Sequence, residues 1–77
     1  MPVEITDLDQ LQTAYKTAVD QWIATIREEE ALASVDHSEA EIDAWEAAGF
    51  REEEARDKAK AAKEAYEAAL REKFFNF

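Results

Sequence analysis

The chain has 77 residues, a formal net charge of −10 and no cysteine. This length allows one domain, close to the lower limit at which a single core stabilises a fold. The lack of cysteine excludes disulfides, a catalytic thiol and cysteine-ligated metals. The first ten residues do not resemble a signal peptide, and no apolar run approaches the length of a membrane span. We therefore expect a single helical domain over residues 1–77, located in the cytoplasm.

The composition predicts an all-α fold. One glycine and one proline are very few chain breakers for 77 residues. Alanine, glutamate, lysine and arginine, the residues that favour helices most, are abundant. The β-branched residues never alternate with polar ones over a useful length, so strands are not expected.

The charge is divided unevenly along the chain. Residues 1–54 hold 15 acidic and 3 basic side chains, a net charge of −12, whereas residues 55–77 hold 4 acidic and 6 basic ones, a net charge of +2. Nucleic acids and anionic membranes would repel most of such a surface. We expect neither as a partner.

The first helix is predicted over about residues 7–33. Thr6 or Asp7 can cap its start, and residues 35–38 form the first plausible turn. Apolar residues follow the cap at intervals of three and four, within roughly 140° of one another, which is typical of a helix face that covers a core. They are Leu8, Leu11, Tyr15, Ala18, Val19, Trp22, Ile23 and Ile26.

The second half of the chain contains one ambiguous position, Gly49. Ser38 and Glu41 form a capping box that starts a helix at residue 39. A left-handed Gly49 would end that helix and let Phe50 pack back on Trp45, and the acids at 52–54 would suit the first turn of a third helix. These signals predict helices at 39–48 and 52–74, so that an antiparallel hairpin is elaborated into a small three-helix bundle.

The alternative is a two-helix hairpin with one continuous helix over 39–74. Positions 41, 45, 48, 52, 55, 59, 62, 66, 69 and 73 follow an unbroken four-three spacing, and glycine inside a helix costs only about 1 kcal/mol relative to alanine. The break is favoured because the cap, the Phe50 contact and the acidic turn agree with one another. In either case the alanines of the last segment should receive the large side chains of the first helix.

No combination of residues predicts an enzyme. His37 is the only histidine, whereas zinc usually needs three or four ligands, so we interpret it as a turn residue. No Glu-x-x-His motif for a di-iron site, calcium loop or glycine-rich phosphate loop is present. We expect no catalytic residue, no metal and no cofactor.

The leading hypothesis is a non-catalytic protein–protein interaction module that self-associates as a dimer. Aromatic burial dominates interface energy, and the chain places several aromatic residues where they can serve as anchors. The predicted partner-binding residues are Trp45, Phe50, Phe74, Phe75 and Phe77. The terminal phenylalanines have a second interpretation, in which Phe74 and Phe77 close the base of the bundle.

The alternative function is an acidic inhibitor or antitoxin-like protein that occupies a basic groove on a target. It is based on the −12 charge of residues 1–54. Neither hypothesis identifies the protein partner.

Overall fold

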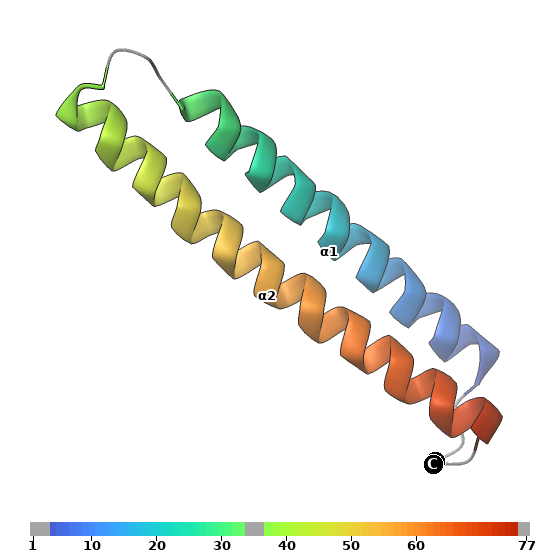
Figure 1. Ribbon diagram of the computed structural model, residues 1–77. Helices are drawn as coiled ribbons and strands as arrows, with labels where there is room; N and C mark the ends of the chain where they lie inside the picture. The colour runs from blue at the N-terminus through green and yellow to red at the C-terminus, as the bar shows by residue number, and fades with distance from the viewer. Residues whose placement is uncertain (1–3, 34–36, 76–77) are drawn as a thin grey trace.

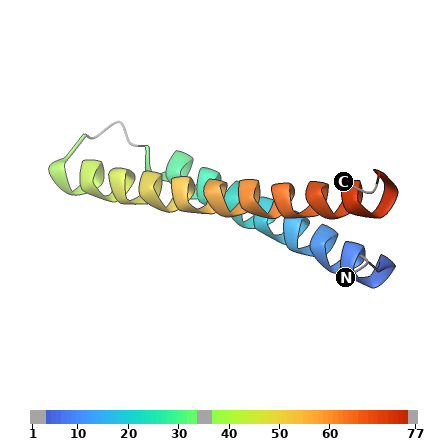
Figure 2. The same ribbon diagram turned by 90° about the horizontal axis from the view of Figure 1, so that it is seen from below.

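A computed structural model describes residues 4–33 and 37–75 of the chain. Two helices, α1 (Ile5–Leu32) and α2 (Glu39–Phe75), run antiparallel and form a hairpin (Figure 1). All regular structure in the described residues is helical, which confirms the all-α prediction. Viewed from below, the axes of the two antiparallel helices cross at an angle, and the helix ends near the chain termini diverge (Figure 2).

The predicted break at Gly49 is wrong, and the alternative of one continuous second helix is confirmed. α2 passes through Gly49, which has no positive φ. Ala48 just before it is 1% exposed, and Glu52 just after it accepts a hydrogen bond from α1. Both sides of the glycine are thus held against α1, and these contacts outweigh the roughly 1 kcal/mol that glycine costs inside a helix.

Both helices start with a capping box, but α1 begins earlier than predicted. α1 begins at Ile5, because Asp7 occupies the third helical position and accepts a hydrogen bond from the Glu4 backbone N–H at 3.1 Å. The second box is confirmed, since Ser38 Oγ accepts from the Glu41 N–H at 3.2 Å. Residues 34–36 of the predicted turn lie outside the described residues.

The contact between the helices is built on small side chains. The buried apolar residues of the described ranges are Leu8, Ala48, Ala59 and Ala69. Alanines let two helix backbones approach closely, as the sequence predicted for this segment. Trp22 and Tyr15 lie against α2: the Trp22 indole N–H donates to Glu52 at 3.1 Å, and the rings of Tyr15 and Tyr66 are 6.5 Å apart.

The hairpin is elongated and has a large surface for its mass. It measures 55 × 17 × 14 Å and has a radius of gyration of 17.3 Å, against about 11.5 Å for a compact domain of this length. Its accessible surface is 6020 Å², whereas a compact protein of 8.8 kDa exposes about 4,800 Å². Two helices in a single layer leave their outer faces without a covering element.

Candidate interaction surface

Four large apolar side chains lie exposed along one side of the hairpin, which we call the apolar edge: Ile23, Ile26, Ile42 and Trp45. Each is 42–46% exposed. At about 100° per residue, Ile23 and Ile26 fall within about 60° of each other on α1, and Ile42 and Trp45 are likewise three residues apart on α2.

The α1 residues and the α2 residues of the apolar edge lie on the same side of the hairpin, as the lining of a hollow shows. Ile42 and Trp45 line this hollow of about 370 Å³ together with Ala33, at the end of α1. Ile26 lies seven residues, or about two turns, before Ala33 and therefore projects from the same side of α1. Leu32, His37 and Glu41 complete the lining.

Ile23 and Ile26 were predicted to belong to the core, and this prediction is wrong. The apolar face of α1 is wide enough to cover two neighbouring helices, but the continuous α2 supplies only one. Leu8, near the start of α1, is buried, and Trp22 is partly covered, while the margin of the face remains exposed.

A second hollow, of about 270 Å³, adjoins the apolar edge and is acidic. Trp45 and Gly49 line it from α2, with carboxylates from Glu29, Glu46 and Glu53 around them. Phe50 completes the lining. Its mixture of an indole ring with three carboxylates would suit a cationic side chain better than an anionic one.

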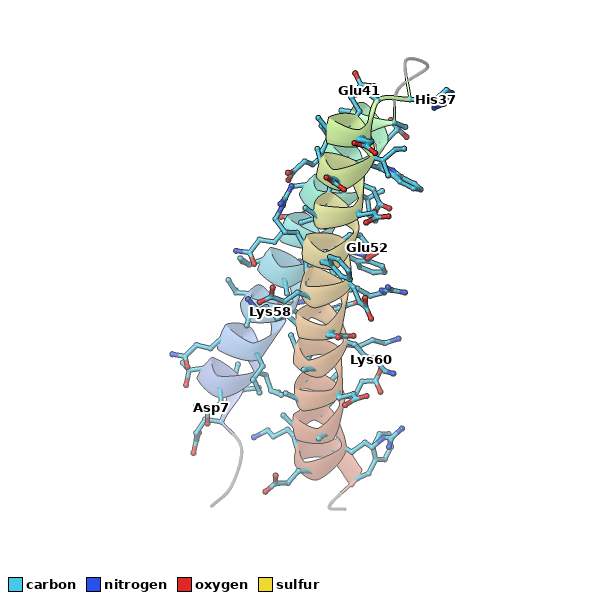
Figure 3. All side chains as sticks on the ribbon, turned by 90° about the vertical axis from the view of Figure 1, so that its left-hand side faces the viewer. Asp7, His37, Glu41, Glu52, Lys58 and Lys60 are labelled. Carbon is cyan, nitrogen blue, oxygen red and sulfur yellow. The ribbon has the colours of Figure 1, made fainter. Side chains whose placement is uncertain are left out.

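The charge along this side of α2 is acidic before residue 55 and mixed after it. Lys60 follows Glu46 and Glu53 at intervals of fourteen and seven residues, so all three project from the same side of the helix. Figure 3 shows Lys60 and Glu52 on one side of α2, and Lys58 on the other. The rows beside the apolar edge thus carry only acids before residue 55, and after it they carry Arg56, Lys60 and Lys63 together with Glu64 and Glu67.

The ion pairs leave part of this pattern without internal partners. Arg56 pairs with Glu52 at 3.3 Å, and Lys58 pairs with Glu54 at 3.5 Å. Lys63 pairs with Glu67 at 3.9 Å. Among the described residues, Glu46, Glu53 and Lys60 take part in no ion pair. These three side chains remain available for charges on another molecule.

The predicted partner-binding aromatic residues fall into two separate groups. Trp45 and Phe50 line the acidic hollow near the interhelical turn, and Phe50 is 71% exposed. Phe74 and Phe75 lie at the opposite end of the hairpin, each 65% exposed. Phe74 therefore does not close a base of the fold, and Phe77 lies outside the described residues.

His37 lies at the turn and not in a cluster of ligands. It is exposed and has a φ of 53°, a left-handed conformation that suits a tight change of direction. Its side chain points away from the helices in Figure 3. Within residues 4–33 and 37–75, no three histidine, cysteine or acidic side chains are grouped in a way that could hold a metal ion.

Sequence reasoning identified Trp45 but missed the aliphatic half of this surface. Ile23 and Ile26 were assigned to the core-covering face of the first helix, and Ile42 was not among the predicted partner-binding residues. The sequence did contain a signal for the exposure of Ile23 and Ile26, because the apolar face of α1 is wider than one partner helix can cover. The charges of Glu46, Glu53 and Lys60 at intervals of seven residues were equally readable, but only on a helix that is continuous through Gly49.

Over the described ranges, neither helix combines the length and the apolar character needed to cross a bilayer. Comparison with protein families, with curated proteins and with solved structures finds no match for this chain.

Proposed function

We propose that the chain is a non-catalytic protein–protein interaction module that works by self-association. The observation that carries this proposal is the imbalance between core and surface. One leucine and three alanines are buried in the described residues, whereas eight large apolar side chains are exposed. They are Ile5, Ile23, Ile26, Ile42, Trp45, Phe50, Phe74 and Phe75.

Self-association follows from the energetics of so small a core. Burying apolar surface contributes about 25 cal/mol per Å², and buried alanines contribute little area each. A hairpin of two helices must nevertheless offset the conformational entropy of every residue that it orders. Covering the apolar edge with another protein surface would add the apolar burial that the isolated hairpin lacks.

Sedimentation equilibrium across a wide concentration range tests this proposal. We expect a mass near twice the 8.8 kDa of the chain at high concentration. The variant Ile23→Asp should shift the equilibrium towards monomer, because it places a charge on the apolar edge. Thr17→Asp, an exposed substitution elsewhere on α1, is the matched control and should keep the mass of the wild type. A wild-type chain that is monomeric at every concentration would refute self-association.

The second candidate function is the acidic inhibitor that occupies a basic groove on a target protein. It is favoured by the charge of residues 27–54, which form the turn half of the hairpin and hold eleven acidic and two basic side chains. Binding of this kind weakens steeply as salt screens the charges, between about 0.05 and about 0.5 M. Apolar self-association should persist over that range, so a salt titration of any complex separates the two functions.

A further inference from the structure

We propose that a second copy of this chain covers the apolar edge in an antiparallel orientation, so that two hairpins form a four-helix bundle. This inference rests on the self-association proposed above and adds the surface and the orientation. In this arrangement α1 packs on α1 of the second copy, and α2 packs on α2, each pair antiparallel.

Charge complementarity selects the antiparallel orientation. Along the side of α2 next to the apolar edge, the acids Glu46 and Glu53 precede Arg56, Lys60 and Lys63. Glu64 and Glu67 lie on the same side after them, and Lys63 pairs with Glu67 at 3.9 Å within the chain, so this half carries mixed charge. If α2 of the second copy runs in the opposite direction, with the two-fold axis near residue 55, then Glu46 lies opposite Lys63 of the second copy. Glu53 likewise lies opposite Arg56 of the second copy. Lys60 of the second copy then comes opposite Gly49, between the two glutamates and over the acidic hollow. A parallel arrangement would instead bring the acidic turn halves of both copies together, which repel each other.

The two-fold axis that relates the two copies of α2 also brings the apolar residues of the two copies of α1 together. Trp22 donates a hydrogen bond to Glu52, so this part of α1 lies level with the place where basic residues first appear on that side of α2. An axis near residue 55 of α2 therefore passes close to Ile23. Ile23 would meet Ile23 of the second copy, with Val19 and Ile26 on either side of the axis. The apolar contact and the charge pattern thus share one centre of symmetry.

The surface of the hairpin is large enough for such a contact. Its 6020 Å² exceeds the area of a compact chain of the same mass by about 1,200 Å². A standard protein–protein interface buries about 800 Å² on each partner. One such contact, on one side of the hairpin, would remove most of the excess.

Disulfide trapping tests the orientation, and the absence of native cysteine makes single-cysteine variants unambiguous. Under mild oxidation Ile23→Cys should form a linked dimer and Glu46→Cys alone should not, because an antiparallel pairing brings residue 23, which lies near the axis, next to its own copy but keeps the two copies of residue 46 apart. A mixture of Glu46→Cys and Lys63→Cys chains should give the mixed disulfide. Lys58→Cys, on the other side of α2, is the control and should remain unlinked.

Charge reversal provides a second readout that needs no cross-link. Lys60→Glu should raise the dimer dissociation constant about tenfold or more, because it places a glutamate between two others in each half of the interface. Lys58→Glu makes the same change of charge on the other side of α2 and should change the constant less than about twofold.

The possible outcomes separate the two proposals. Sedimentation that gives only monomer refutes self-association, and the antiparallel bundle with it. A dimer that links through Lys58→Cys, or in which Glu46→Cys links to itself, leaves self-association standing and overturns the orientation proposed here. Equal weakening by Lys58→Glu and Lys60→Glu would also overturn the proposed interface.

Discussion

Replacing Gly49 by alanine should stabilise the protein. Gly49 is the only glycine of the chain, and it lies inside α2 with a φ that is not positive. A β-carbon at this position would meet the Glu29 carboxylate oxygen at 3.6 Å, an ordinary van der Waals contact. No steric cost opposes the helix preference of alanine.

The expected gain is about 1 kcal/mol, the difference between glycine and alanine in a helix interior. For a chain of this size it corresponds to a rise in melting temperature of about 4–8 °C. Thermal unfolding followed by circular dichroism at 222 nm measures the change. Ala47→Gly is the matched control, since Ala47 is an exposed neighbour in the same helix, and it should lose about the same free energy.

A fall in melting temperature for Gly49→Ala would refute this reasoning. It would show that residue 49 adopts a left-handed conformation, and hence that α2 is broken there, because alanine is strained at positive φ. Unfolding should be measured at two protein concentrations tenfold apart. Association contributes to the apparent stability in a concentration-dependent way, whereas the helix preference of residue 49 does not.

Three further substitutions test the contacts that hold the hairpin, each by chemical or thermal unfolding. Ser38→Ala should cost about 1 kcal/mol, because the Glu41 N–H loses its cap; an unchanged stability would mean that this helix end frays in solution. Trp22→Phe should cost about 1 kcal/mol through loss of the hydrogen bond to Glu52, and pairing it with Glu52→Ala in a double-mutant cycle should show the coupling. Leu8→Ala should cost about 2 kcal/mol, the low end for a buried leucine, since it lies near the end of the hairpin; a loss below about 0.5 kcal/mol would argue against its burial.

The sequence was sufficient to predict the all-α class, the start of the second helix and the antiparallel direction of packing. Composition excluded strands, and the capping box at Ser38 and Glu41 located the start of α2. These features are local, because a capping residue acts on backbone groups within one turn. The start of α1 was placed two residues late for a local reason as well, since Asp7 acts as the third helical residue and not as the cap.

Whether the helix continues through Gly49 could not be predicted from the neighbouring sequence. Its flanking residues carry the signals of a helix end, and those signals agreed with one another. α2 continues because Ala48 and Glu52 are held against α1 on either side of the glycine. Such contacts depend on residues of α1 up to thirty positions away in the sequence, which local patterns do not contain.

The candidate surface was also only partly readable from the sequence. An exposed Trp45 was expected from its aromatic character, but the exposure of Ile23 depends on how many helices cover the wide apolar face of α1. Since α2 is continuous, only one does. The sequence by itself determined the helical class, the capping and the division of charge, all of which follow from composition and from interactions within a turn. Only the tertiary structure decided that α2 is unbroken and that one side of the hairpin stays open, because both depend on packing between distant segments.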